Sequence, residues 1–338
     1  MIRLLITCVG GELMPYLLKY IKTIDNPKVY IVGTDFNHNA VGRLLCDKFY
    51  TVPLGKDISY IEKIINLTKK EKINLVLPTS DEEALVLAKN KKLFNKNNIN
   101  LACINYKELR ILNNKQKTYT VLKEKGFNVA EWHNLVSFED FREKVEYYDK
   151  LYKKFIVKPK EGRGSRNIFI VSNENKKNKH LELNYLSKKE LFNKIGKNKK
   201  LSEFIIMQKL NHPVVDIDLL GWRGKPLSVI PRQRINPLFP NMGHKILGDK
   251  KLITLGRKLI RSFNLSWLYD CDVMFNDKKE PVIIEINPRQ SGSISVSIAA
   301  GYEIFKNLLK LHSKGKIIQE KKIHSLTIVP YKSLYIKK

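Results

Sequence analysis

The stretch from Val282 to Ser293, VIIEINPRQSGS, constrains the fold of this chain most strongly. Its first half is rich in β-branched residues, which predicts a strand. Glu285 and Asn287 are two residues apart, so on a strand they share a face. Pro288 then ends the strand, and an arginine follows. Carboxylate and amide oxygens are ligands that Mg²⁺ prefers, and arginine pairs with anions. The stretch predicts a metal–phosphate site, although a solvated strand end would look similar.

The segment before it strengthens this prediction. Leu268–Phe275, LYDCDVMF, is typical of a strand, and Asn276–Glu280, NDKKE, is typical of a short turn. The two strands should therefore form an antiparallel hairpin. Such pairing would bring Asp272 beside Glu285, so that three oxygen ligands, including Asn287, converge on one face.

A Gly-rich segment predicts a second binding element. A strand ending near Lys158 leads into the loop Glu161–Asn167, EGRGSRN, and the chain then returns as a strand. Gly162 and Gly164 permit a close approach of backbone N–H groups to phosphate oxygens, and Ser165 adds a donor. The loop joins two strands and lacks Gly-Lys-Ser/Thr, so it is not a Walker loop. An ordinary Gly-rich hairpin is the alternative.

The N-terminal third predicts a different architecture. Ile2–Val9 and Val29–Thr34 are typical of buried strands, and a helix is expected between them. This succession favours a parallel, Rossmann-like sheet. Gly10 and Gly11 do not complete a G-x-G-x-x-G motif, so the sequence does not support nucleotide binding there. Ser80 and Asp81 follow a later strand, where either can cap a helix and where ligands of such sheets gather.

Taken in chain order, these features resemble the ATP-grasp superfamily, and especially its carbamoyl-phosphate synthetase and biotin carboxylase type. The similarity runs from the first strand to about Gly315. The ordered set of motifs is more specific than any one of them. The resemblance implies an α/β chain in which a Rossmann-like N-terminal (pre-ATP-grasp) domain precedes a two-lobed ATP-grasp fold.

The resemblance also implies a domain division. Residues 1–105 would form the Rossmann-like domain, and 106–207 the linker helices with the small lobe and its Gly-rich loop. Residues 208–325 would form the large lobe with the metal hairpin, and 326–338 a C-terminal tail. Residues 173–202 are polar and rich in Lys and Asn, which indicates a surface insertion.

Site residues follow from the same resemblance. Nucleotide contacts are implied for Lys115, Lys158, Gly162, Gly164, Ser165, Gln208, Lys209, Leu210 and Asp216. Metal binding is implied for Asp272, Glu285 and Asn287, and catalytic charge stabilisation for Arg232, Arg234 and Arg289. Many relatives carry Glu where this chain has Gln208, which leaves the contact of that residue open. His244 is better explained as a structural or solvated histidine than as a ligand contact.

The implied reaction is ADP-forming ligation of a carboxylate to an amine through an acyl phosphate. ATP and Mg²⁺ would be required, and Mn²⁺ can substitute for Mg²⁺. A kinase-like phosphotransferase and a nucleotide-binding protein without ligase activity are alternatives. The sequence identifies neither the carboxylate nor the amine. A homodimer is a candidate assembly.

Composition adds two constraints. Lys and Arg number 62 against 33 Asp and Glu, a net charge of +29 that suggests nucleic acid. However, 50 of the basic residues are scattered lysines without an interleaved aromatic stripe, so no specific nucleic-acid partner is expected. No run approaches the roughly 18 apolar residues of a membrane span. The start, MIRLLITCVGG, predicts a strand rather than a signal peptide, and we expect a cytoplasmic protein.

Overall fold

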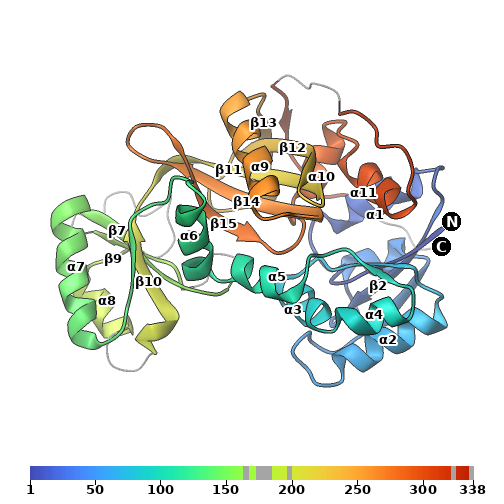
Figure 1. The fold of residues 1–338 in the computed structure, drawn as a ribbon, viewed down its shortest axis with the longest axis horizontal. Helices are drawn as coiled ribbons and strands as arrows, with labels where there is room; N and C mark the ends of the chain where they lie inside the picture. Colours follow the sequence, from blue (N-terminus) through green and yellow to red (C-terminus); the bar gives the residue numbers. More distant parts are fainter. Residues whose placement is uncertain (163–166, 173–184, 196–199, 321–324, 335–338) are drawn as a thin grey trace. The chain divides into compact units, whose positions relative to one another are not determined.

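The computed structural model describes residues 1–162, 167–172, 185–195, 200–320 and 325–334 (Figure 1). The chain divides into two compact units. The first unit contains Met1–Arg110, Val214–Asp272 and Ile286–Lys338, and the second contains Ile111–Pro213 and Val273–Glu285. The four-part domain division that the sequence predicts stays a prediction.

The N-terminal part of the first unit is built on a five-stranded parallel sheet of order β3-β2-β1-β4-β5. Its strands are β1 (Ile2–Ile6), β2 (Val29–Asp35), β3 (Lys48–Thr51), β4 (Leu75–Leu77) and β5 (Asn100–Leu101). The helical segments are α1 (Met14–Lys22), η1 (Val41–Leu45), α2 (Tyr60–Lys70), α3 (Asp81–Lys89) and α4 (Lys91–Lys96). α5 (Tyr106–Asn113) begins in this unit, whose first segment ends at Arg110. Buried leucines and isoleucines of α1 pack in the core with β1, as an amphipathic helix requires. The predicted parallel, Rossmann-like sheet is confirmed.

A six-stranded sheet of order β15-β14-β11-β12-β13-β16 carries the predicted metal hairpin. Its strands are β11 (Asn211–Trp222), β12 (Lys225–Arg234), β13 (His244–Ile246), β14 (Trp267–Phe275), β15 (Pro281–Asn287) and β16 (Thr327–Ile328). β14 and β15 are neighbours joined by the predicted turn, in which Asn276 and Glu280 are hydrogen-bonded through their backbones. The helical segments in this part are η3 (Pro240–Met242), α9 (Lys250–Ser262), α10 (Ile294–Ala299) and α11 (Ile304–His312). α9 lies so close to the sheet that a Cβ atom at Gly256 would meet Val229 at 2.6 Å.

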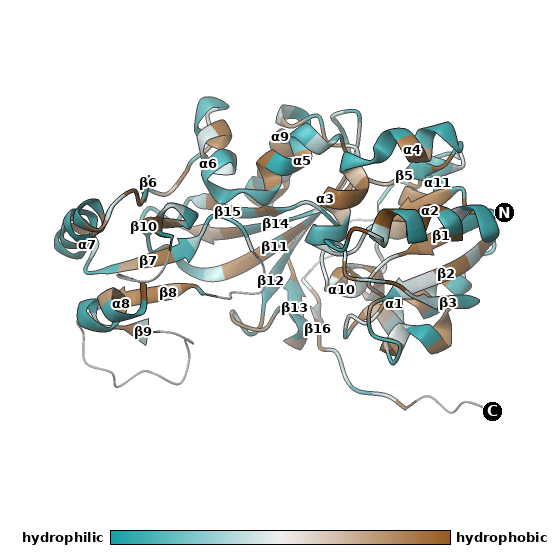
Figure 2. Cartoon of the chain, turned by 90° about the horizontal axis from the view of Figure 1, so that it is seen from below, coloured by the Kyte–Doolittle hydropathy of each residue, from teal (hydrophilic) through white to brown (hydrophobic). Residues whose placement is uncertain are grey.

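The second unit is built on a five-stranded sheet of order β6-β10-β7-β8-β9. Its strands are β6 (Trp132–Asn134), β7 (Lys154–Pro159), β8 (Phe169–Ser172), β9 (Tyr185–Leu186) and β10 (Phe204–Gln208), with helical segments α6 (Lys115–Glu124), α7 (Phe138–Tyr152), α8 (Lys188–Ile195) and η2 (Leu201–Glu203). α7 begins where the Ser137 hydroxyl accepts a hydrogen bond from the Asp140 N–H. Its many hydrophilic residues are visible in Figure 2, whereas Phe141 and Val145 enter the core.

The expected pair of strands around the Gly-rich loop is present. β7 and β8 pair antiparallel, with Val157 opposite Phe169. Gly164 and Ser165, which were predicted to contact phosphate, lie outside the described residues. No helix within the described ranges is long and apolar enough to cross a membrane.

Candidate active site

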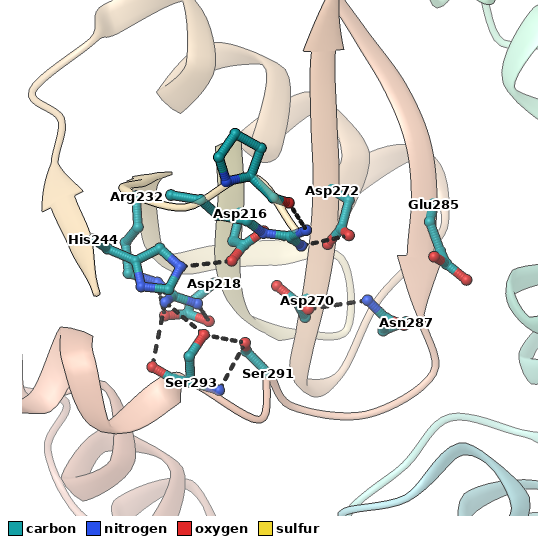
Figure 3. A network of polar contacts seen from close by, with 12 residues as sticks. Asp216, Asp218, Arg232, His244, Asp270, Asp272, Glu285, Asn287, Ser291 and Ser293 are labelled. Atoms are coloured by element: carbon teal, nitrogen blue, oxygen red, sulfur yellow. Dashed lines mark hydrogen bonds and ion pairs between the residues drawn. The ribbon is translucent and has the colours of Figure 1, made fainter. Parts of the chain in front are cut away.

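Three neighbouring strands of the six-stranded sheet each carry two charged residues at alternate positions. Asp216 and Asp218 lie on β11, Asp270 and Asp272 on β14, and Arg232 and Arg234 on β12. Because side chains two apart on a strand share a face, each pair is directed to one side of the sheet. Together with Asp81, Asn287 and Arg289 of the same unit, these residues form what we call the Asp/Arg cluster. Figure 3 shows the polar contacts of several of its members, among them Asp216, Asp218 and Arg232.

Arg234 links two of the carboxylates in this cluster. Its Nε donates to Asp216 Oδ1 at 2.7 Å, and its Nη2 donates to Asp272 Oδ2 at 2.7 Å. His244 Nε2 lies 2.8 Å from the other oxygen of Asp216. Burial opposes the charge of Asp216, but Arg234 and His244 hold the pKa of this carboxyl well below its usual range. Arg234 keeps 13% of its side chain exposed, so it remains accessible to a ligand.

Arg232, two residues earlier on β12, is enclosed. It is 0% exposed, and its guanidinium binds Asp218 Oδ1 at 2.9 Å and the Ser293 hydroxyl at 2.9 Å. Ser297 also donates to Asp218. Burial lowers the pKa of Arg232, but the carboxylates of Asp218, Asp216 and Asp270 together more than offset this and raise it above its ordinary value. These contacts favour a supporting role for Arg232, in which it holds the turn after the Asn-Pro-Arg segment. The predicted contact with a transferring group is less consistent with them.

Arg289, which follows β15, pairs with the N-terminal end of α3 in the same unit. Its Nε lies 2.8 Å from Asp81 Oδ1, and its Nη2 donates to Asn287 Oδ1 at 3.3 Å. Asp81 is the first residue of α3, whereas the capping hydroxyl belongs to Ser80. The sequence left open which of these two residues caps the helix. The structure assigns the cap to Ser80, and Asp81 pairs with the arginine.

Asp270 is a member of the cluster that sequence reasoning missed. It is 4% exposed, and its Oδ2 accepts a hydrogen bond from Asn287 Nδ2 at 2.9 Å. Its Oδ1 is buried without a hydrogen-bond partner among the described residues. Burial, followed by the nearby charges of Asp272 and Asp216, raises the pKa of Asp270 well above its usual value. The alternation Asp-Cys-Asp in LYDCDVMF was the available signal, because it places both carboxylates on one face.

A second group of predicted residues lies in the second unit, and we call it the Lys/Tyr cluster. It consists of Lys115 and Tyr119 on α6, Lys158 on β7, and Ile284 and Glu285 on β15. Lys115 Nζ lies 2.8 Å from Glu285 Oε1 and 3.2 Å from the carbonyl oxygen of Gly162. Lys158 Nζ donates to the Tyr119 hydroxyl at 2.8 Å. The structure therefore brings Lys115, Gly162 and Glu285 together.

The predicted adenine hinge lies at the end of β10. Gln208 is the last residue of this strand, and its backbone N–H donates to the carbonyl oxygen of Glu131 at 2.9 Å. Lys209 and Leu210 connect it to β11, and Leu210 is buried. Their contacts with a nucleotide stay a prediction.

The Asp/Arg cluster contains oxygen donors of the kind that Mg²⁺ prefers, and its carboxylates are paired with guanidinium groups. Five carboxylates (Asp81, Asp216, Asp218, Asp270 and Asp272) face three guanidinium groups (Arg232, Arg234 and Arg289). Buried charges need compensation, and hard oxygen atoms suit Mg²⁺. No group of three or more His, Cys, Asp or Glu side chains that could hold a metal occurs within the described ranges. The predicted ligand set of Asp272, Glu285 and Asn287 differs from such a group, because it contains one amide.

Two family models match the sequence. Residues 4–102 match the model described as the PylC-like N-terminal domain. Residues 200–333 match the model described as ATP-grasp in the biosynthetic pathway with Ter operon. No curated protein sequence matches this chain.

Several solved structures share the fold. N5-carboxyaminoimidazole synthetase from Staphylococcus aureus, complexed with ADP, has a TM-score of 0.70 at 16% identity, over 97% of this chain and 81% of its own. L-amino acid ligase from Bacillus licheniformis has a TM-score of 0.63 at 15% identity, over 94% and 75% respectively. Biotin carboxylase from Campylobacter jejuni has a TM-score of 0.65 at 17% identity, over 94% and 72%. At these identities the likeness is one of fold.

Proposed function

This chain belongs to the ATP-grasp superfamily, and on that premise we propose that it is an ATP-dependent ligase that joins a carboxylate to an amine and releases ADP. One observation carries the proposal. Arg234 and Arg289, two guanidinium groups that retain exposed surface, lie among the oxygen atoms of Asp272 and Asn287 in one unit. Such a site can bind an anion beside hard-oxygen ligands for a cation, and phosphoryl transfer requires both.

The nucleotide roles are assigned to the second unit. Lys158 and Lys115 would contact phosphate oxygens. Gly162 would allow backbone approach, because no atom of the residues that the structure describes lies within 4 Å of a Cβ built there. Gly164 and Ser165 would complete the loop. Gln208 to Leu210 would meet the adenosine. The carboxylate of Asp216, tied to Arg234, would orient that arginine rather than contact the nucleotide directly.

The proposed reaction has two steps. A carboxylate oxygen of the substrate attacks the γ-phosphorus of ATP, forming an O–P bond while the β–γ bridge oxygen leaves with ADP. The amine nitrogen then attacks the acyl carbon, and phosphate leaves with the electron pair of the C–O bond and takes up the proton that the nitrogen loses. Arg289 and Arg234 would hold the oxygens that gain charge. Asp272, Glu285 and Asn287 would hold Mg²⁺, which supplies charge neutralisation at the phosphates when bound.

A screen of ADP release tests this function. Amino acids come first as substrates because a structural neighbour is an L-amino acid ligase, followed by small carboxylic acids and polyamines. We expect ADP formation that depends on both a carboxylate and an amine, with a condensed product in the mass spectrum. The matched control is Glu285→Gln, which keeps the shape and removes a charge, and which should stay folded without Mg²⁺-dependent turnover. A stable phosphorylated product formed without an amine would indicate a phosphotransferase instead.

We also propose that the protein forms a homodimer. A biotin carboxylase domain from Hydrogenobacter thermophilus, similar in fold to this chain, forms a dimer in its crystal structure. Light scattering of the purified protein tests the assembly: a mass near twice the 39.3 kDa of the chain is expected. A monomer mass would exclude it.

A further inference from the structure

Tyr119 occupies a central place in the Lys/Tyr cluster, although no predicted role involved it. The residue is 1% exposed, and its ring lies 6.1 Å from that of Trp132. Its hydroxyl lies 2.8 Å from Lys158 Nζ and 2.6 Å from the carbonyl oxygen of Ile284. A carbonyl only accepts and an ammonium only donates. The hydroxyl hydrogen therefore points to Ile284, and an oxygen lone pair faces Lys158.

The Tyr119 ring also contributes to the environment of Lys158. The ammonium lies 5.4 Å from the ring centroid, within the range of a cation–π attraction. Lys158 itself is only 5% exposed. A lysine has a long, flexible stem, and fixing it on ligand binding costs conformational entropy. A hydroxyl that already holds the ammonium in one place reduces this cost when an anion binds.

Helix α6 also contacts Glu285, the residue of β15 that follows Ile284. Lys115 lies four residues before Tyr119 on α6, so both side chains project from one face of the helix. Tyr119 holds the carbonyl of Ile284, and Lys115 holds the carboxylate of Glu285. One turn of α6 thus connects a lysine of β7 with two consecutive residues of the strand that carries a predicted metal ligand.

We propose that Tyr119 is a positioning residue for the nucleotide site. It fixes the ammonium of Lys158, and its hydrogen bond to the Ile284 carbonyl sets the position of this lysine relative to β15. The inference rests on the proposed function, because it requires that Lys158 contacts ATP. A purely structural tyrosine would behave differently: loss of its hydroxyl would lower stability and leave ATP affinity unchanged.

The test compares two isosteric substitutions in the same unit. Tyr119→Phe keeps the ring and removes the hydroxyl. The matched control is Tyr148→Phe, because Tyr148 is also fully buried and its hydroxyl lies 3.0 Å from His133 Nδ1, among residues with no proposed nucleotide role. Calorimetry with ATP and Mg²⁺ gives Kd, and thermal melting gives Tm. We expect Tyr119→Phe to weaken ATP binding about 10-fold, since it removes a hydrogen bond to a charged group. Tyr148→Phe should leave Kd unchanged even where Tm falls.

A double-mutant cycle shows whether Tyr119 acts through Lys158. In a Lys158→Ala background, Tyr119→Phe should cause little further loss of ATP affinity. An equal loss in both backgrounds, or an unchanged Kd for Tyr119→Phe alone, would overturn the inference. If the parent binds ATP and Lys158→Ala weakens it, that failure leaves the proposed function standing. If the parent chain binds no ATP, the proposed function and this inference both fail.

Discussion

The two clusters use opposite balances of charge. In the Asp/Arg cluster five carboxylates meet three guanidinium groups, and several members are almost completely buried. In the Lys/Tyr cluster two lysines meet one glutamate. An excess of buried negative charge favours a cation, whereas an excess of positive charge favours phosphate. The first unit contains the environment that favours a cation, and the second unit contains the one that favours phosphate.

The clusters also differ in how their charges are held. Guanidinium groups are planar and grip two oxygens in a fixed geometry, as Arg234 does between Asp216 and Asp272. Lysine presents a point charge on a flexible stem, and Lys158 is held from outside by a tyrosine hydroxyl. Substitutions in the Asp/Arg cluster should therefore lower stability and catalytic rate. Substitutions in the Lys/Tyr cluster should instead lower nucleotide affinity.

The largest expected effect is on stability, at Arg232. Arg232→Met leaves the Asp218 carboxylate buried without its cation, because the two side chains are both fully buried. We expect the free energy of unfolding to fall by about 3–5 kcal/mol, measured by urea denaturation. Replacing both partners, as Arg232→Met with Asp218→Leu, should recover most of this loss. A loss below about 1 kcal/mol for the single variant would contradict the supporting role of this pair.

Arg289 should affect catalysis more than folding. Lysine keeps the charge of Arg289 but cannot reproduce its planar contacts with two oxygens. Once a substrate is known, Arg289→Lys should lower kcat about 100-fold or more, with ATP affinity and Tm close to those of the parent. Turnover within a few-fold of the parent would instead make Arg289 a structural partner of Asp81. A matching fall in Tm would mean that it holds the segment after β15 in place.

Substitution of Lys158 should lower nucleotide affinity, in contrast to the effects on stability and catalysis expected in the Asp/Arg cluster. Lys158→Ala removes one charge-assisted hydrogen bond, so ATP should bind about 10- to 150-fold more weakly by calorimetry. Lys188→Ala is the control, because Lys188 pairs with Glu146 and Asp149 on α7 and has no proposed role at the site. An unchanged ATP affinity for Lys158→Ala would remove this lysine from the nucleotide site.

The smallest effect concerns the pH dependence of stability that arises from His244, which contacts Asp216 of the Asp/Arg cluster. Burial lowers the pKa of His244 below its ordinary value of 6.5, so the imidazole takes up a proton less readily in the folded protein than in the unfolded chain. Below this pH the unfolded chain binds a proton more readily, and stability must fall as the pH falls. His244→Gln can still donate to Asp216 and does not titrate. Between about pH 7.5 and about pH 5.5 the parent should lose stability relative to this variant, by at most about 1.4 kcal/mol per pH unit. Parallel curves would show that His244 does not titrate on unfolding.

Much of the fold followed from local sequence. β-branched runs separated by helical segments predict a parallel sheet without long-range information, and the N-terminal sheet is parallel as expected. The strand over Val282–Asn287 and its neighbour β14 followed from composition and a short turn. These features are local because backbone preferences and strand alternation act over a few residues.

The sequence by itself determined which residue types could bind a nucleotide, a metal and an anion, and in what order they occur. It could not rank Arg232 against Arg234, because two residues of one type on one strand face look equivalent until the packing around each is known. The Asp-Cys-Asp alternation places Asp270 on the same face as Asp272. The sequence could not reveal the partners of Asp270 and Tyr119, because Asn287 and Ile284 are distant from them in the chain. Only the tertiary structure decided these assignments, because burial and pairing depend on segments that meet through folding rather than through neighbouring positions in the chain.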